Sequence, residues 1–389
     1  MFGSLPPEGR DLDLLARPAA EAAIAEALAG RGLLRRGSQW ALFAGGTAFG
    51  VELIPAESWG LPADELERLF AEATPLPGAR KLVEPAPHHA LLIAASTHGG
   101  RLDPKLRARV ARQLSRDGSA WEAAEARAAH WRAERALAAL RRTYERPASE
   151  VPARFTLGRV GRAISTARSG HVVALSGLDG AGKSSQAESI ERALAQLGIP
   201  AAVVWTPFAS NRSLRLLAMP AKRLLGRKSG DAAEAPSLVA RPGSDRAGGG
   251  PLGALVAHGW ATVVAVANGL AQRRASLPHL LRGRVVIFDR YTLDSAVHLR
   301  YLYGEARRFR LQNALIVGLS PKPLRAYLLD VAPETVVARK AVQYELDHVR
   351  RQARLYREEQ EQRGVKRLDG ERPREELSAE ILADVWSAL

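Results

Sequence analysis

The spacing of hydrophobic residues changes near residue 170. Beyond this point, short continuous apolar runs alternate with stretches of helical periodicity. The apolar runs predict five strands, at residues 171–176, 201–205, 284–288, 325–330 and 365–368. Continuous apolar strands joined by helices are typical of a parallel sheet covered on both faces. The C-terminal part is therefore predicted to be an α/β domain with a five-stranded parallel sheet.

The part of the chain before residue 146 has a different pattern, in which strands and helices do not alternate regularly. Its candidate strands and helices lie at residues 11–17, 18–30, 39–44, 48–54 and 104–143. The last of these ranges is an Ala/Arg/Glu-rich run, which predicts long helices. This mixture predicts a smaller α+β domain over residues 1–145 that ends in long helices.

Three segments interrupt or test this division. Residues 146–170 combine proline, glycine and serine and predict a linker, so the C-terminal domain spans residues 171–389. Residues 226–253 have little hydrophobic content and no periodicity, which predicts a flexible insertion. Residues 252–271 are nearly uncharged and about long enough to span a membrane. Because leucine and isoleucine are sparse there, we expect a core helix and no membrane span.

Composition narrows the class of protein. The chain has 389 residues, of which 46% are hydrophobic and 25% charged, as in globular proteins of two or three domains. It contains no cysteine, which excludes disulfides, thiol catalysis and cysteine-ligated metal centres. The N-terminus lacks the pattern of a secretory signal peptide, so we expect a cytoplasmic protein.

The chain is strongly basic, with a formal net charge of +15 and an isoelectric point near 10.6. Such a charge is compatible with nucleic acid, anionic lipid or small phosphorylated ligands as partners. Only eight of the 56 basic residues are lysine and no block of like charges stands out, which favours a general compositional bias. Nucleic acid is therefore the least favoured partner.

The segment VVALSGLDGAGKSSQ, residues 172–186, matches the phosphate-loop pattern G-x-x-x-x-G-K-[ST] between a predicted strand and a predicted helix. Glycines let backbone N–H groups converge on an anion, and the helix N-terminus adds a positive field. Lys183 adds a full charge, and the Ser184 hydroxyl can bind Mg²⁺. The candidate phosphate-binding residues are Gly177, Asp179, Gly180, Ala181, Gly182, Lys183, Ser184 and Ser185.

A second candidate segment is VVIFDRYTLDS at residues 285–295. Asp289 ends a predicted buried strand, at the edge of a parallel sheet where ligands bind. It is placed to organise Mg²⁺ or to accept a proton, and Arg290 beside it suits capture of an acceptor phosphate. Lys183, Asp289 and Arg290 are the candidate catalytic residues, and Ser184 and Asp289 are the candidate metal ligands.

Together, GLDGAGKSSQ at 177–186, RVVIFDRYTLDS at 284–295 and RAYLLDVAPETVVARK at 325–340 resemble the thymidylate kinase family. The resemblance covers about residues 170–389. It implies a P-loop kinase fold that uses ATP and Mg²⁺ to phosphorylate a nucleoside monophosphate such as dTMP. It also implies that Asp179 faces the acceptor sugar, that a lid over ATP begins near Arg339, and that the protein forms a homodimer.

Several positions depart from the family pattern. The segment WTPFASNRS at 205–213 keeps Pro207 but lacks the family's Arg-Glu pair, for which Arg212 or Arg215 is a candidate substitute. Asn268 occupies the position of the arginine that holds the base. Two alternatives therefore stay open: a nucleotidyl- or phosphotransferase acting on another small molecule in a modification pathway, and an ATP-binding regulatory module without fast turnover.

The N-terminal part carries a second candidate site. Gly3-Ser4 precedes Asp11 and Asp13 on a predicted strand, and Glu52 lies on a later strand. Carboxylates two residues apart on a strand point the same way, and a third across the sheet can complete a Mg²⁺ site. These features, with ALLIAASTHGG at 90–100, resemble uncharacterised bacterial nucleotidyltransferase-like proteins. The family's first helix has no counterpart here, so the domain is either truncated or degenerate.

Three histidines of the N-terminal region, His88, His89 and His98, raise the question of a metal site. The sequence shows no cysteine and no acidic pair at helical spacing beside them. We therefore expect solvated or core histidines.

Overall fold

The computed structural model describes residues 11–44, 47–76, 82–146, 170–206, 251–303, 309–340 and 345–389. The chain divides into two compact units: an N-terminal unit of residues 1–42 and 49–159, and a C-terminal unit of residues 43–48 and 160–389. The division falls within the predicted linker at 146–170, most of which lies outside the described residues. The same holds for residues 226–250 of the predicted insertion.

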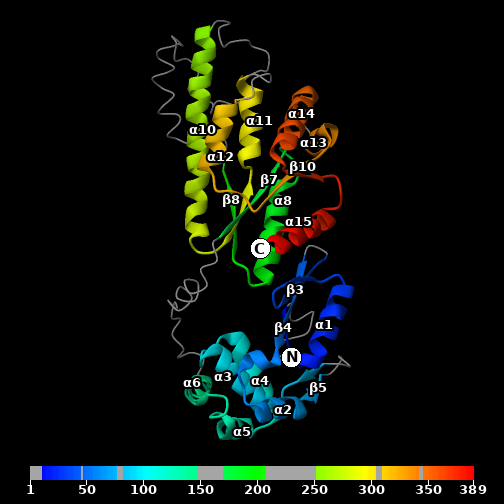
Figure 1. Cartoon of the computed structure of the whole chain (residues 1–389), viewed down its shortest axis with the longest axis vertical. Helices are drawn as coiled ribbons and strands as arrows, with labels where there is room; N and C mark the ends of the chain where they lie inside the picture. The colour runs from blue at the N-terminus through cyan, green and yellow to red at the C-terminus, as the bar shows by residue number, and fades with distance from the viewer. Residues whose placement is uncertain are drawn as a thin grey trace. The chain divides into compact units, whose positions relative to one another are not determined.

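A five-stranded sheet forms the centre of the C-terminal unit (Figure 1). Its strands are β7 (His171–Gly177), β8 (Ala201–Trp205), β9 (Val285–Asp289), β10 (Arg325–Asp330) and β11 (Lys366–Asp369). They lie in the order β11-β10-β7-β9-β8, and each neighbouring pair is parallel. The predicted parallel sheet is confirmed, and each strand lies within one residue of its predicted range.

Helices cover both faces of this sheet. They are α8 (Lys183–Gln196), α10 (Pro251–Leu280), α11 (Thr292–Tyr303), α12 (Arg310–Leu319), α13 (Pro333–Lys340), α14 (Leu346–Arg363) and α15 (Arg374–Ala388). Val173 and Leu175 of β7 join the core that contains α8 and α15, whereas Val172 and Ala174 pack with Leu280 of α10. Burial on both faces explains the long apolar runs of the central strands β7 and β9, whereas the edge strand β11 buries only Leu368.

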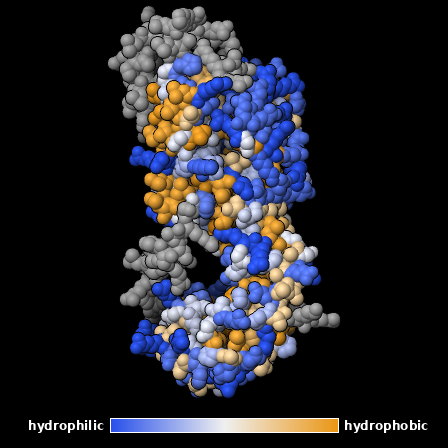
Figure 2. Space-filling view, viewed as in Figure 1, coloured by the Kyte–Doolittle hydropathy of each residue, from blue (hydrophilic) through white to orange (hydrophobic). Residues whose placement is uncertain are grey.

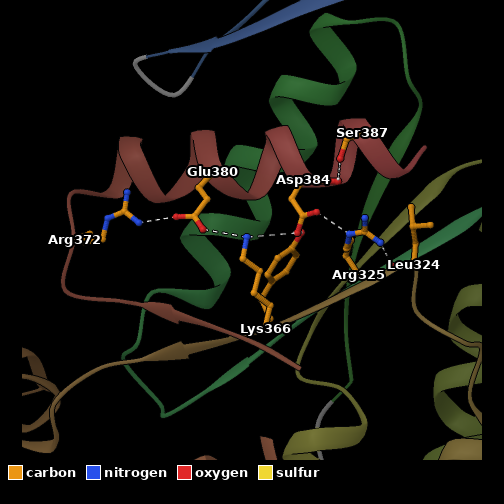
Figure 3. A network of polar contacts seen from close by, with 8 residues as sticks. Leu324, Arg325, Lys366, Arg372, Glu380, Asp384 and Ser387 are labelled. Atoms are coloured by element: carbon orange, nitrogen blue, oxygen red, sulfur yellow. Dashed lines mark hydrogen bonds and ion pairs between the residues drawn. The ribbon is translucent and has the colours of Figure 1, made fainter. Parts of the chain in front are cut away.

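A charged network fastens α15 to β10 and β11 (Figure 3). Arg325 Nε donates to Asp384 Oδ1 over 2.8 Å. Lys366 Nζ lies 3.1 Å from Glu380 Oε1, and Arg372 Nη1 donates to Glu380 Oε2 over 2.6 Å. The carboxylates of α15 therefore alternate with basic groups from the sheet edge and the preceding loop.

Helix α10 contains the long apolar run at 252–271. Among its described residues, Ala261, Val264 and Ala265 are buried in a cluster that includes α12, while the opposite side of the helix is exposed. Figure 2 shows apolar residues gathered over α10 and α12. The exposed large apolar side chains of these two helices are Val263, Leu270, Leu277, Leu311 and Val317. Across the described ranges of the chain, no helix combines the length and apolarity needed to cross a membrane.

The N-terminal unit is a smaller α+β unit with a four-stranded sheet in the order β1-β4-β3-β2. Its strands are β1 (Asp11–Ala16), β2 (Leu34–Arg36), β3 (Gln39–Ala44) and β4 (Thr47–Pro55), with β5 (Thr74–Pro75) and β6 (Val83–Glu84) forming a separate hairpin. Its helices are α1 (Pro18–Gly30), a 3₁₀ turn (Ala56–Trp59), α2 (Ala63–Ala71), α3 (Pro87–His98), α4 (Pro104–Arg116), α5 (Ala120–Arg127) and α6 (Glu134–Glu145).

The prediction of long helices over residues 104–143 was wrong. The run is divided into α4, α5 and α6. The first break is at Asp117, whose carboxylate accepts hydrogen bonds from the backbone N–H and hydroxyl of Ser119, a local alternative to helical bonding. The second is near Arg132, which has a left-handed φ of 50°. Three short helices pack around one core in place of a long one.

Candidate phosphate-binding site

The loop between β7 and α8 has the backbone geometry that its glycines predict. Gly177, Gly180 and Gly182 have φ values of 145°, 101° and 88°, which L side chains rarely adopt. A Cβ atom at Gly177 would also lie 2.6 Å from the backbone oxygen of Leu329 on β10. The loop therefore requires glycine at its first position, both for its φ and for its close approach to the next strand.

Lys183 lies at the start of α8 and is only 4% exposed. Its Nζ donates to the backbone oxygens of Gly177, over 2.9 Å, and Leu178, over 2.7 Å. Burial lowers the pKa of Lys183, and the negative charge of Asp294 opposes that shift. A buried ammonium group held by carbonyls of the loop is placed to meet an anion that the loop binds.

Ser184 and Asp289 come together although they are 105 residues apart. The Ser184 hydroxyl donates to Asp289 Oδ2. Asp289 is 6% exposed, and its Oδ1 makes no hydrogen bond within the described residues. A buried acceptor without a partner is costly, so this oxygen is available to a ligand. A hydroxyl beside a carboxylate is a donor set that suits Mg²⁺, and the assignment of Ser184 and Asp289 as metal ligands stays a prediction.

Asp179 and Arg290 also meet. Arg290 Nη2 donates to Asp179 Oδ1 over 3.0 Å, and both side chains are partly exposed. Arg290 has a φ of 78°, a left-handed conformation that costs a non-glycine residue about 1–3 kcal/mol. Its backbone N–H is held by Leu175 O at 3.0 Å. The chain thus turns sharply after β9 and directs the guanidinium toward the phosphate loop.

Arg290 lies in an acidic setting that keeps it charged. Burial alone would lower its pKa, but Tyr356, Asp294, Asp179 and Asp289 together raise it. A permanently charged guanidinium with some of its surface exposed can hold a phosphate by paired hydrogen bonds.

Two site residues are missing from the sequence prediction, Asp294 and Tyr356. Asp294 Oδ2 accepts from the backbone N–H of Tyr291 over 2.8 Å, and Tyr356 donates its hydroxyl proton to Asp294 Oδ1 over 2.8 Å. Asp294 is the third residue of α11 and accepts from the N–H of the residue before the helix, as the acidic residue of a capping box does. Because that residue is Tyr291 and not serine or threonine, the sequence lacks the full motif. Tyr356 comes from α14 and has no local pattern that could reveal it.

The remaining predicted residues lie around the loop. Arg339 Nη1 donates to Gly180 O over 3.4 Å, Ala181 is buried within the loop, and Ser185 O accepts from Arg374 Nη2 over 2.9 Å. Asn268 is 6% exposed, and its Nδ2 makes no hydrogen bond within the described residues. Pro207, Arg212 and Arg215 lie outside the described residues.

In the N-terminal unit, the strand register places two of the three candidate acidic residues opposite each other. Strands β1 and β4 are parallel, with Asp13 opposite Glu52 and Asp11 opposite Gly50. Asp13 lines a cavity of about 110 Å³ whose other walls are mainly apolar, and Glu52 accepts a 3.3 Å hydrogen bond from the Ser38 hydroxyl. The side chain of Asp11 lies outside the described residues.

Comparison with known proteins gives one partial similarity. A 132-residue alignment is 33% identical to the thymidylate kinase of Symbiobacterium thermophilum. It covers 31% of this chain and 61% of that protein. No protein-family model matches the chain. A portion of the chain is thus similar at a distance to a thymidylate kinase, and the chain spans less than two thirds of that protein's length.

Proposed function

We propose that the C-terminal unit transfers the γ-phosphoryl group of ATP to a nucleoside monophosphate, with Mg²⁺ as cofactor. The observation that carries this proposal is the hydrogen bond from Ser184 to Asp289 Oδ2. It leaves the buried Oδ1 of Asp289 available to a ligand, in the same site as the buried Lys183. A hydroxyl, a carboxylate and a buried cation within one loop and one strand end serve phosphoryl transfer better than nucleotide binding alone.

Each side chain has a defined role in the reaction. An oxygen of the acceptor phosphate attacks the γ-phosphorus of ATP, and the bond from the γ-phosphorus to the bridging oxygen breaks to release ADP. Lys183 stabilises the charge on the transferring group, and Arg290 grips the acceptor phosphate. Ser184 and Asp289 would hold Mg²⁺, which when bound neutralises charge on the β- and γ-phosphates.

The residues proposed to bind the phosphate acceptor suit a nucleoside monophosphate, but they do not specify which base it carries. Asp179 and Arg290, joined at 3.0 Å, offer an acceptor for sugar hydroxyls and a donor for phosphate side by side. The resemblance to thymidylate kinases and the partial similarity found above favour dTMP. Asn268 in place of the base-binding arginine favours testing other bases and other phosphorylated molecules as well.

The experiment is ADP release by the purified full chain with ATP and Mg²⁺, across dTMP and the other common nucleoside monophosphates. Acceleration by one or more of them, absent in Lys183→Ala and Asp289→Ala and retained in Arg192→Ala on the exposed face of α8, supports the proposal. If ATP binds but no monophosphate accelerates turnover, the kinase proposal fails. The unit would then act on another small molecule or respond to ATP without fast turnover.

A second activity is proposed for the N-terminal unit, nucleotidyl transfer with Asp11, Asp13 and Glu52 as Mg²⁺ ligands. The register that sets Asp13 opposite Glu52 supports it. The test is Mg²⁺-dependent release of pyrophosphate from nucleoside triphosphates. Loss of that release in Glu52→Gln, with ADP release unchanged, would support it, and no release from wild type would contradict it.

The homodimer implied by the family resemblance also stays a proposal, which the exposed apolar side chains of α10 and α12 support (Figure 2). Val263, Leu270 and Leu277 follow one another at seven-residue spacing and so share one side of α10. Light scattering should give twice the chain mass, and Leu270→Glu should give a monomer. A monomer in wild type would contradict the dimer.

A further inference from the structure

A cluster of three potential metal ligands lies in the N-terminal unit, apart from the two candidate sites described above. Glu72 Oε2 lies 3.1 Å from His88 Nε2 and 3.8 Å from His89 Nδ1. The three ligand atoms all lie within 4.8 Å of one another, and within the described ranges no other group of three His, Asp or Glu residues has this arrangement. Glu72 follows α2, and the two histidines lie in the first turn of α3.

His89 is the unusual member of the cluster. Its side chain is completely buried, and neither ring nitrogen makes a hydrogen bond to the residues that the structure describes. Its ring stacks on Trp131, with centroids 5.8 Å apart. An imidazole that leaves both nitrogens unsatisfied inside a core costs about 1–3 kcal/mol. Burial, and the positive field of His88, lower the pKa of His89 to about 4, so the ring is neutral at pH 7. A neutral imidazole has one ring nitrogen with a lone pair, which is the atom that binds a metal ion.

The surroundings are balanced for a cation. The positive charge of Arg127 acts on His89. Arg127 forms an ion pair with Glu65, and the negative charge of Glu65 offsets it. Trp131 Nε1 donates to the same Glu65 over 3.2 Å. Asp117 lies within electrostatic range of His88 and adds negative charge on the outer side. Glu72 is 42% exposed, which gives an ion a path from solvent.

We propose that Glu72, His88 and His89 form a binding site for a divalent transition-metal ion of the Zn²⁺ class. Bonds of about 2.0–2.1 Å at tetrahedral angles separate ligand atoms by about 3.3–3.4 Å. The two distances from Glu72, 3.1 and 3.8 Å, bracket that separation, and the two imidazole nitrogens lie within 4.8 Å of each other. Two imidazoles select transition metals over Mg²⁺ and Ca²⁺, which prefer oxygen ligands. Water would take the remaining position.

The location gives the site a structural consequence. Its ligands lie on either side of the β5–β6 hairpin, which connects α2 to α3. A bound ion would therefore tie the end of α2 to the beginning of α3 and close the intervening segment. Because the ion binds the folded form, it raises the free energy of unfolding of this unit.

The test is calorimetric titration of Zn²⁺ into the full chain, freed of any histidine tag and of metal, together with thermal unfolding with and without Zn²⁺. We expect one ion per chain and a higher unfolding temperature. His88→Gln and Glu72→Gln, both at the accessible side of the cluster, should each weaken binding at least about tenfold. The matched control His130→Gln, an exposed histidine of the same unit, should change affinity less than about twofold.

Two results would overturn the proposal. One is the absence of saturable Zn²⁺ binding to wild type at micromolar concentrations. The other is binding that survives in both ligand variants, which would place the ion elsewhere on the chain. Substitution with Co²⁺ adds a spectroscopic measure, because a tetrahedral site with nitrogen and oxygen ligands gives visible absorption bands that both variants should lose.

Discussion

The candidate phosphate-binding site of the C-terminal unit can be found in the sequence, whereas the histidine cluster of the N-terminal unit can be found only in the structure. Most of the first site comes from one continuous segment of the chain, which runs from Gly177 at the end of β7 through the loop to Lys183 and Ser184 at the start of α8. The second joins Glu72 to two histidines across a hairpin. A site formed by one segment of the chain can be predicted from its sequence motif. A site formed by residues from separate segments can be recognised only when the fold is known.

The largest expected effect is on the contiguous site. Lys183→Met keeps the length of the buried side chain and removes its charge, so kcat for phosphoryl transfer should fall about 10²- to 10³-fold. Steady-state ADP release measures this loss. If the two sites are independent, Zn²⁺ should raise the unfolding temperature of this variant as much as that of wild type. Loss of both phosphoryl transfer and Zn²⁺ stabilisation would show that the two sites are not independent.

The next effect concerns the stability of the loop. Gly177→Ala introduces a Cβ 2.6 Å from Leu329 O at a φ of 145°, and should lower the free energy of unfolding by about 2–4 kcal/mol. Gly198 has a φ of 72°, but a Cβ atom added there would have no described neighbour within 4 Å. Gly198→Ala should therefore cost only about 1 kcal/mol. Urea unfolding of both variants tests the difference, and equal losses would rule out the close approach as its cause.

A smaller effect, on KM values, distinguishes residues that bind the phosphate acceptor from residues that bind ATP. Arg290→Lys keeps the charge but loses the planar, paired donors, so the KM for the acceptor should rise about tenfold while the KM for ATP stays the same. Arg282→Lys, on an exposed residue beyond α10, is the matched control. A change in the KM for ATP instead would assign Arg290 to the donor side.

The smallest effect tests the network of α15. The hydrogen bond from Arg372, followed by that from Lys366, lowers the pKa of Glu380 below its usual 4.5. This contribution is present above pH 4.5 and is lost as the pH falls through the lowered value in the folded state. Because Glu380 is 33% exposed, it amounts to under about 1 kcal/mol. Glu380→Gln should weaken the fall in the unfolding midpoint as the pH is lowered below 4.5. An unchanged dependence of the midpoint on pH would contradict the prediction.

The central strands of the C-terminal unit were predictable because they are buried on both faces. Val172 and Val173 pack into different clusters, so residues 172–175 of their strand form a continuous apolar run that can be recognised in the sequence. The N-terminal helices were harder to predict. The Ala/Arg-rich run is divided at two places. One is the turn at Asp117-Gly118-Ser119, an Asp-Gly signal in the sequence that the prediction overlooked, and the other is the left-handed residue Arg132, which no local pattern reveals.

The same contrast holds within the candidate site. Asp289 and Arg290 were predictable because an acid at the end of a buried strand has a limited set of positions in a parallel sheet. Tyr356 was not, because it lies 62 residues from Asp294 on a different helix, and the pattern of that helix does not indicate which residue its hydroxyl contacts. Residue type and spacing predict the candidate phosphate-binding groups, and they miss Asp294 and Tyr356, which form hydrogen bonds beside those groups.

The most direct measurement follows the labelled γ-phosphoryl group of ATP in the presence of Mg²⁺ and each nucleoside monophosphate, with wild type and Asp289→Asn compared. Asp289→Asn preserves the shape of the side chain and removes the charge that suits a metal ion. We predict that label moves to a nucleoside diphosphate with wild type and that transfer is lost in the variant. Label that stays in ATP or is found only as free phosphate, or transfer that is undiminished in Asp289→Asn, would contradict the assignment of this site to phosphoryl transfer.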